Sequence, residues 1–330
     1  MSSDALCKKE ENELNKHKHP HYHLRLNKAI DRLIFIDIIK AFSTSINIQK
    51  KKYRYVGFGG PYLEDFKLVS GLFPNMKMVS LETDKETHKR QIFHKCTKNI
   101  QLLNDSFDKF LDQTDLFDKY PVIIWLDFTD DTIKCLRQIE ALCKRIIEKS
   151  LIRITLNSEP NDNSYSPKYF EKIHSEYLSI KFKTIDLEQP EKLSKIVCQM
   201  AEKSINKGLQ SAKLVFLPLH RVRYRDGQQM ITLTGIICEQ KGSDDIFKKM
   251  KDQCPYLNTD NGLDIIDIPA LTLKERLNLD RYLPTAKEDG KTIAKKLGYM
   301  IEELEDKNLR KCKQYEKYYR YYPHFNKIIP

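Results

Sequence analysis

The sequence predicts an α/β fold built on a doubly wound, mostly parallel sheet that ends in an antiparallel hairpin. Short apolar runs alternate with helical stretches from residue 53 onward, as expected when helices cover both faces of a parallel sheet. The last two runs are joined differently, by the segment Arg221–Gln229. This segment contains Asp226-Gly227, and such a pair between two strand-like runs is a strong signal for a hairpin.

A polar segment and one helix are predicted before the sheet. Residues 1–24 are polar and rich in His and Lys, which is typical of a poorly ordered tail. Between Asn27 and Ser45, apolar residues recur at helical spacing, which predicts a leading helix. We therefore expect a first region over residues 1–50, made of a polar tail and this helix.

Seven apolar runs predict the strands of the core, which we expect to span residues 51–240. These runs are Tyr53–Gly57, Met76–Leu81, Ile100–Leu103, Val122–Leu126, Leu151–Leu156, Lys213–Leu219 and Met230–Cys238. Helices are expected between the first five, near Tyr62–Leu72, Lys85–His94, Phe107–Phe117 and Thr132–Lys149. A helical insertion is predicted near residues 160–210, and residues 241–330 are predicted to form a helical, tyrosine-rich extension.

The terminal hairpin distinguishes two classes of cofactor-binding fold. Five parallel strands followed by an antiparallel pair match the seven-stranded Rossmann-like sheet of methyltransferases. A Rossmann domain that binds NAD would instead end in a sixth parallel strand. The predicted topology therefore favours S-adenosylmethionine over NAD as the cofactor.

A glycine-rich turn follows the first strand, in the sequence YRYVGFGGPYLEDF that begins at Tyr53. Glycines let the backbone approach a ligand closely and take positive φ values. The N-terminus of the next helix would offer free N–H groups to an anion, such as a cofactor's carboxylate. Tyr62 stands where the dinucleotide fingerprint has its third glycine, which counts against NAD. A simple tight turn between strand and helix is the competing interpretation.

Acidic residues follow three of the predicted strands. Glu82 ends the second strand about 25 residues after Gly57, the distance at which a carboxylate accepts hydrogen bonds from ribose hydroxyls. Asp127 closes the fourth strand, at the carboxyl edge where ligands bind in such sheets. Asp105 follows the third strand. A helix-capping acid is the competing interpretation for Glu82 and for Asp105.

Together these motifs resemble the class I methyltransferases, which use S-adenosylmethionine. The shared order is a glycine turn, Glu82, Asp105, Asp127 and then a terminal hairpin. More narrowly, the runs YVGFGG, DF, MVSLETD and WLDFTD are similar to those of a group of bacterial proteins classed as O-methyltransferases. The similarity covers residues 26–240, and the segment Tyr315–Phe325 also fits.

The resemblance implies a role for each cofactor-binding candidate. Gly57 and Gly59, with Gly60 as a further candidate, would lie against the methionine part of S-adenosylmethionine. Glu82 would hold the ribose, and Asp105 would hold the adenine amino group. The methyl acceptor is not identified by this resemblance.

Two departures from the family pattern bear on these roles. Tyr55 replaces the acidic residue usual at the head of the first motif, which normally helps to hold the cofactor's amino group. The run DFTD replaces the Asn/Asp-Pro-Pro-aromatic tetrad of the methyltransferases that modify base amines. We therefore do not expect methylation of exocyclic amines in DNA or RNA.

Methyl transfer is an in-line displacement, so the protein must mainly position the nucleophile and exclude water. An oxygen nucleophile also needs a base or a metal, and Asp127 is the candidate base. Asp127, Asn157 and Glu159 carry oxygen ligands that would suit Mg²⁺, but such residues commonly cap turns. We accordingly predict no metal ligands.

Composition limits the class of protein and its partners. The net charge of +11 makes nucleic acid a possible partner, and no apolar run approaches the roughly 20 residues that a membrane span requires. The eight cysteines are scattered without a CxxC pair, as in a reduced, cytoplasmic protein. The oligomeric state cannot be read from the sequence.

The sequence is consistent with three functions. The favoured one is an S-adenosylmethionine-dependent methyltransferase of unidentified substrate, with O-methylation as one reaction it could carry out. The alternative is a non-catalytic sensor or scaffold that keeps the Rossmann-like fold and contacts nucleic acid or a protein complex. An NAD-dependent enzyme is the weakest, because of Tyr62 and the hairpin.

Overall fold

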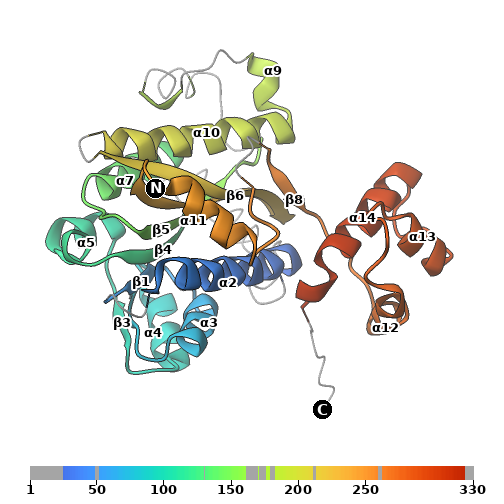
Figure 1. Cartoon of the computed structure of the whole chain (residues 1–330), viewed down its shortest axis with the longest axis horizontal. Coiled ribbons are helices and arrows are strands. Elements are labelled where there is room, and N and C mark those ends of the chain that lie inside the picture. Colours follow the sequence, from blue (N-terminus) through green and yellow to red (C-terminus); the bar gives the residue numbers. More distant parts are fainter. Residues whose placement is uncertain are drawn as a thin grey trace, which may run out of the picture. The chain divides into compact units, whose positions relative to one another are not determined.

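The structure is a computed structural model, shown in Figure 1, that describes residues 25–48, 52–129, 131–160, 170, 176–178, 183–210, 213–258 and 262–323. The predicted polar tail, residues 1–24, lies outside these ranges, as do residues 161–169, 171–175 and 179–182 of the predicted insertion. None of the described helices is both long and apolar enough to cross a membrane.

The described residues form an eight-stranded sheet with the strand order β3-β2-β1-β4-β5-β7-β6-β8. The strands are β1 (Arg54–Gly57), β2 (Lys77–Leu81), β3 (Ile100–Leu103), β4 (Val122–Asp127), β5 (Ser150–Asn157), β6 (Leu214–Asp226), β7 (Gln228–Glu239) and β8 (Asp264–Ile266). Strands β1 to β5 run parallel to one another, and β7 runs antiparallel to β5. The predicted fold class is therefore confirmed, while the short strand β8 was not predicted.

The helices fall close to where the sequence predicts them. They are α2 (Leu26–Ile46), α3 (Glu64–Leu72), α4 (Lys85–His94), α5 (Phe107–Gln113), α6 (Leu116–Lys119), α7 (Thr132–Cys143), α9 (Thr184–Leu187), α10 (Pro190–Leu209), α11 (Ser243–Lys251), α12 (Leu273–Leu279), α13 (Lys291–Leu297) and α14 (Glu305–Tyr318). Short 3-10 turns follow at η4 (Asp280–Tyr282) and η5 (Tyr319–Tyr321). The single helix expected over Phe107–Phe117 is divided, because Thr114 is extended and its hydroxyl accepts a bond from the Leu116 N–H.

Helices cover both faces of the sheet, because successive side chains of a strand point to opposite faces. Val56 of β1 belongs to a core cluster with residues of α5, α7 and α10. Tyr55, its neighbour, packs instead against Phe66 of α3, and Trp125 of β4 packs against Phe35 of α2. Figure 1 shows α7 and α10 on one side of the strands and α2 on the other.

Helix α10 lies in the region predicted as a helical insertion, and it packs closely on α7. The Ser204 hydroxyl donates a hydrogen bond to the Leu136 carbonyl. At Gly208, a Cβ atom would lie 2.5 Å from Cys143 Cβ and 2.5 Å from the Glu140 carbonyl oxygen. A glycine is therefore required where the two helices approach, and α10 forms part of the layer that covers the sheet.

The contacts divide the chain into two compact units, which we call the sheet unit and the helical unit. The sheet unit comprises Phe35–Arg223 and Gln229–Asp264. The helical unit comprises the described residues up to Ile34, the hairpin tip Tyr224–Gln228 and the described residues from Ile265 onward. The helical unit is thus assembled from three separate stretches of the chain.

Within the helical unit, Asn27 connects all three stretches. Its backbone N–H donates to the Asp226 carboxylate at 3.1 Å, and its side-chain amide donates to the Arg225 carbonyl at 2.9 Å. Its side-chain oxygen accepts from the Ile268 N–H at 3.0 Å. The same Asp226 carboxylate accepts from the Lys28 N–H at 2.7 Å, so the hairpin tip caps the start of α2.

The tyrosine-rich segment packs inside the helical unit. Tyr315 and Tyr322 are buried, with ring centroids 5.8 Å apart. The Tyr315 hydroxyl donates to Asp280 at 2.6 Å, and the Tyr322 hydroxyl accepts from the Leu271 N–H at 2.8 Å. The tyrosines at helical spacing therefore serve packing, as the periodicity predicts.

Candidate functional site

The sequence-predicted site residues meet at one edge of the sheet. Gly57 ends β1, Glu82 follows β2, Asp105 follows β3 and Asp127 ends β4. These four strands are parallel and adjacent in the order β3-β2-β1-β4, with Gly57 in register with Ser80 and Trp125. Their carboxyl ends therefore lie along one edge, which is where ligands bind in open α/β sheets.

The glycine turn after β1 needs glycine for conformation and for space. Gly59 has φ +70° and Gly60 has φ +53°, backbone angles that residues other than glycine rarely adopt. A Cβ atom on Gly59 would lie 2.6 Å from Leu63 Cδ2 and 2.8 Å from Ser80 Oγ. Position 59 therefore requires glycine, because a side chain there would collide with Leu63 and Ser80.

Gln91 of α4 forms hydrogen bonds to the backbone of this turn. Its side-chain nitrogen donates to the carbonyls of Phe58 at 2.8 Å and Gly60 at 3.0 Å. The Ser80 hydroxyl donates to the same Phe58 carbonyl at 3.1 Å and lies 3.3 Å from the Gln91 side-chain oxygen. Gln91 and Ser80 are fully buried, so these bonds form in a low-dielectric environment where they are strong.

A buried carboxylate lies beside Gly57. The Tyr55 hydroxyl donates a hydrogen bond to Asp65 Oδ2 at 2.5 Å, and both residues are buried. The same Asp65 oxygen lies 3.6 Å from the position that a Cβ atom on Gly57 would take. Sequence reasoning did not identify Asp65, although the run LEDF that contains it belongs to the glycine motif.

The start of α3 is negatively charged, whereas we expected it to offer N–H groups to an anion. The helix begins at Glu64, and its first turn carries the carboxylates of Glu64 and Asp65. Leu63, the residue before it, has φ +53° and makes no side-chain cap. Two acids in the first turn stabilise the helix dipole and repel a bound anion, so we do not propose this end as a carboxylate site.

Glu82 is half-buried just beyond β2, and its carboxylate is oriented by the backbone. Oε1 accepts a hydrogen bond from the Asp84 N–H at 2.9 Å. Burial raises the pKa of Glu82 above its ordinary value, and the bonds from the backbone of Asp84 and Thr83 oppose this rise. Asp84, not Glu82, caps α4 by accepting from the Thr87 N–H at 2.7 Å.

Asp105 lies in a more open setting beyond β3. It forms an ion pair with Lys109 of α5 at 2.8 Å, and its side chain retains 26% exposure. The bond from Lys109 holds the pKa of Asp105 below its usual value. Ser106 caps α5 by accepting from the Lys109 N–H at 3.3 Å, so Asp105 is not the cap residue of this helix.

Asp127 is half-buried at the end of β4 and pairs in register with Thr155 of β5. The other candidate metal ligands serve the local backbone. Asn157 accepts from the Glu159 N–H at 2.8 Å, and Glu159 accepts from the Gln229 N–H at 3.1 Å. Among the residues that the structure describes, no group of three or more His, Cys, Asp or Glu side chains could hold a metal ion.

Three phenylalanines from three motifs form an aromatic cluster at this edge. Ring centroids lie 5.5 Å apart for Phe58 and Phe128, 6.2 Å for Phe58 and Phe107, and 6.5 Å for Phe107 and Phe128. All three pairs meet edge to face, the arrangement that aromatic rings favour. Phe107 and Phe128 are buried, while Phe58 is half-buried.

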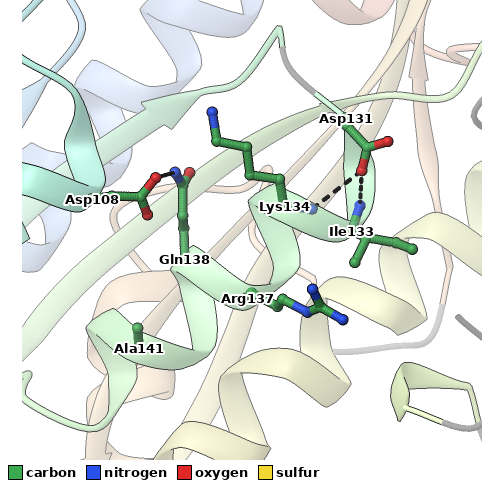
Figure 2. Close-up of a pocket in the computed structure, with 7 residues that line it drawn as sticks. All are labelled: Asp108, Asp131, Ile133, Lys134, Arg137, Gln138 and Ala141. Carbon is green, nitrogen blue, oxygen red and sulfur yellow. Dashed lines mark hydrogen bonds between the residues drawn. The ribbon is translucent and has the colours of Figure 1, made fainter.

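A second surface feature is an open groove along α5 and α7, shown in Figure 2. Gln138 donates to the Asp108 carboxylate across it at 2.6 Å, and Asp131 caps α7 by accepting from the N–H groups of Ile133 and Lys134. None of the predicted site residues lines this groove. It is therefore distinct from the edge that carries the glycine turn.

A comparison with protein families relates most of the chain to a known group. The profile of the family described as "Putative O-methyltransferase" matches residues 20–330. The chain belongs to this family. The match includes both the sheet with its glycine turn and the tyrosine-rich C-terminal region. It confirms the resemblance to class I methyltransferases that the motifs indicated.

Other comparisons add little to the family match. A search of curated proteins returned no match. Similar solved structures include the plantazolicin methyltransferase BamL with a triazolic desmethylPZN analog and SAH, at a TM-score of 0.41 and 8% identity over 63% of this chain and 85% of that one. The related BpumL in complex with SAH has a TM-score of 0.37 and 10% identity, covering 71% and 91%. A fibrillarin/Nop5p complex has a TM-score of 0.35 and 11% identity, covering 57% and 73%. Similarities this distant carry no argument about function.

For this member of the family, the site has parts that the sequence motifs do not reveal. Gln91 looks like an ordinary polar residue of a surface helix, and only the fold shows that Gln91 and the acid of the run DF, Asp65, are buried beside the glycine turn. The aromatic cluster has a weak signal in the sequence. Phe58 directly follows Gly57 and Phe128 directly follows Asp127, whereas Phe107 lies two residues after Asp105.

Proposed function

We propose that this protein binds S-adenosylmethionine at the carboxyl edge of its sheet and transfers the methyl group to a hydroxyl of an acceptor. The observation that carries the proposal is the meeting of a close-packed glycine turn and an oriented carboxylate, Glu82, at adjacent strand ends. Membership of the O-methyltransferase family supports the reaction class.

The residues at the edge fit this cofactor. Gly57, Gly59 and Gly60 would let the backbone of the turn approach the methionine part closely, and Gly59 and Gly60 take the positive φ values that shape this turn. Glu82 would accept hydrogen bonds from the ribose hydroxyls, because its ionised carboxylate has acceptor capacity beyond the Asp84 bond. Asp105 would accept from the adenine amino group.

The bound cofactor supplies an electrophilic methyl group on a sulfonium centre. The residues of the chain bind and orient it, and the aromatic cluster of Phe58, Phe107 and Phe128 keeps water from this part of the edge. Asp127 would accept the proton of the acceptor hydroxyl as it attacks.

Binding is tested first, by calorimetry and thermal shift with S-adenosylmethionine, S-adenosylhomocysteine and NAD. We expect the first two to bind and NAD not to bind. Glu82→Ala should weaken both cofactors, whereas Glu86→Ala, which removes an exposed acid paired with Lys89 on the same helix, should not. If none of the three ligands bound the wild type, the proposal would be wrong.

Turnover separates an enzyme from a non-catalytic scaffold. Transfer of a labelled methyl group from S-adenosylmethionine is measured into fractionated metabolites, proteins and nucleic acids from a cell extract. Asp127→Asn should keep cofactor binding and lower the rate by a factor of about 10² to 10⁴, the usual contribution of a general base. Binding without transfer to any fraction would favour the scaffold.

Two further features stay predictions. A cytoplasmic location rests on the cysteines, and those that the structure describes are all unpaired thiols, six of them buried. Contact with nucleic acid rests on net charge alone and is not part of the proposal.

A further inference from the structure

Exposed apolar side chains are concentrated in the helical unit, on and around α12. Among the described residues, nine large apolar side chains are exposed, and six of them lie between positions 273 and 304. Single exposed apolar residues are ordinary on a soluble protein, whereas several gathered on one surface mark an interaction site. The six are Leu273, Leu277, Tyr282, Tyr299, Met300 and Leu304.

An open groove in this region brings apolar side chains together. Leu273 and Leu277 are one turn apart on α12, so they lie on the same face of that helix. Together with Leu297, the last residue of α13, and Tyr299, they line the groove. Leu273 and Leu277 are 62% and 58% exposed, so most of each side chain is uncovered. We call Leu273, Leu277, Leu297 and Tyr299 the apolar face.

The apolar face is held in place by hydrogen bonds within the helical unit. The Tyr299 hydroxyl donates to the Glu275 carboxylate of α12. The Ile301 N–H donates to the side-chain oxygen of Asn308, in α14, at 2.8 Å. These bonds fix the segment after α13 against two helices. A face that is ordered before binding loses little freedom when a partner packs on it.

Charges of both signs accompany the apolar face. Lys274 and Arg281 line the same groove. Glu302 and Glu303 lie in the segment just after Tyr299, close in sequence to the exposed apolar residues. In the part of the chain that the structure describes, none of these four charged side chains forms an ion pair. The cations and the acids are therefore available to a partner.

The presence of both signs indicates which partner fits. An anionic membrane or a nucleic acid would be attracted by the two cations but repelled by the two carboxylates. A second copy of the chain supplies both signs. In a two-fold dimer each copy presents the same face to the other, so the acids of one copy can meet the cations of its partner.

We propose that the protein forms a two-fold symmetric dimer in which the apolar faces of two copies pack together. In this dimer, Lys274 and Arg281 of one copy pair with Glu302 and Glu303 of the other. The inference does not depend on the proposed methyl transfer, because it uses residues of the helical unit alone.

The test measures the mass of the whole chain by analytical ultracentrifugation over a wide range of protein concentration. Leu277→Asp places a charge in the apolar face. Ile92→Asp is the matched control, because Ile92 of α4 is 56% exposed but lies outside that face. Circular dichroism reports whether each variant is folded, and substitutions at exposed positions such as these are usually tolerated.

We expect the wild type and Ile92→Asp to dimerise, and Leu277→Asp to raise the dissociation constant of the dimer by a factor of about 10 to 100. Charge reversal keeps the test decisive if Leu277→Asp does not fold. Lys274→Glu with Arg281→Glu, or Glu302→Lys with Glu303→Lys, should weaken the dimer by a factor of about 10, because like charges then face each other. All four substitutions together should restore it, since each charge again meets its opposite.

Other results would overturn the inference. A wild type that is monomeric at every concentration would show that the face does not bind a second copy. A dimer that persists in Leu277→Asp would use a different surface. If the fourfold variant stayed as weak as the double variants, the acids and cations would not meet across a two-fold axis. A monomer that sediments with vesicles of phosphatidylcholine and phosphatidylserine, but not as Leu277→Asp, would assign the face to a membrane instead.

Discussion

The two halves of the carboxyl edge of the sheet, at the ends of β1 and β2 and at the end of β3, are built differently. On the side of β1 and β2, the polar groups are buried and bonded to one another, as Gln91 is to the glycine turn and Tyr55 is to Asp65. On the side of β3, Asp105 pairs with Lys109, and both side chains retain contact with solvent. The acids reflect this, since burial raises the pKa of Glu82 whereas Lys109 lowers that of Asp105.

This difference predicts which contacts with a cofactor would be preorganised. Buried, fully bonded groups lose little freedom when a ligand arrives, so their contacts contribute more to affinity than contacts from exposed side chains. We therefore expect the ends of β1 and β2 to determine cofactor affinity, and the end of β3 to adjust it. The predictions below test this contrast, beginning with the largest effect.

The largest effect is expected for Gly59→Ala. The substitution places a Cβ at φ +70° and 2.6 Å from Leu63 Cδ2, so we expect it to destabilise the protein by about 3 kcal/mol and to abolish cofactor binding. Urea denaturation and calorimetry measure the two. Gly242→Ala is the matched control, because its φ is +94° but no atom lies within 4 Å of the added Cβ. Equal losses in both variants would mean that backbone strain, and not packing of the turn, is responsible.

Gln91→Leu tests the support beneath the turn. It leaves the carbonyls of Phe58 and Gly60 without the Gln91 bonds in a buried setting, which should cost about 2 kcal/mol of unfolding free energy. Gln113→Leu, at an exposed glutamine of α5, should change stability little. If the two variants were equally stable, the glycine turn would not depend on Gln91.

Glu82→Gln should weaken S-adenosylhomocysteine by a factor of about 10, because the ribose hydroxyls lose an ionised acceptor. Burial raises the pKa of Glu82, so its carboxyl group stays protonated to a higher pH in the folded protein than in the unfolded chain. The contribution of Glu82 to stability therefore falls as pH rises from the unfolded pKa through the folded pKa.

Ligand affinity has the opposite dependence on pH, since only the ionised carboxylate accepts from both hydroxyls. In the wild type, affinity should fall as pH is lowered through the folded pKa of Glu82. Titration by calorimetry at several pH values should show a weaker fall in Glu82→Gln. The same slope in both proteins would assign the titration to another group.

The smallest effect is expected at Asp105. Asp105→Ala should weaken S-adenosylhomocysteine by a factor of about 3, as for one hydrogen bond on a solvent-exposed side. Lys109→Ala is the control, since it removes the ion pair but keeps the carboxylate for adenine. A loss at Asp105 larger than that at Glu82 would reverse the contrast between the two halves.

The sequence predicts the fold well because its signals are local. Apolar runs and the Asp226-Gly227 pair mark strands and the hairpin, and the strand ends then locate Glu82, Asp105 and Asp127 at one edge. The Tyr55 to Asp65 bond could not be predicted, because it depends on the direction of a tyrosine that crosses from a strand to a helix.

The other differences from prediction have separate physical causes. Gln91 lies in helix α4, where the apolar residues Ile92 and Phe93 are exposed while Gln91 is fully buried, so residue type alone predicts the wrong buried face. The division of the helix expected over Phe107–Phe117 depends on the bond at Thr114, which the apolar spacing of the segment conceals. Strand β8 is only three residues long and carries no periodic signal.

The bonds of Asn27 have a consequence for biosynthesis. Its partner Ile268 lies 241 positions further along the chain. At a synthesis rate of roughly 5 to 20 residues per second, the beginning of α2 leaves the ribosome on the order of ten seconds or more before that partner is made. During this interval the nascent helix start lacks the groups that later surround it, and it is then open to chaperones and proteases. The helical unit is therefore completed only after Ile268 has been made, whereas most of the sheet unit is made before it.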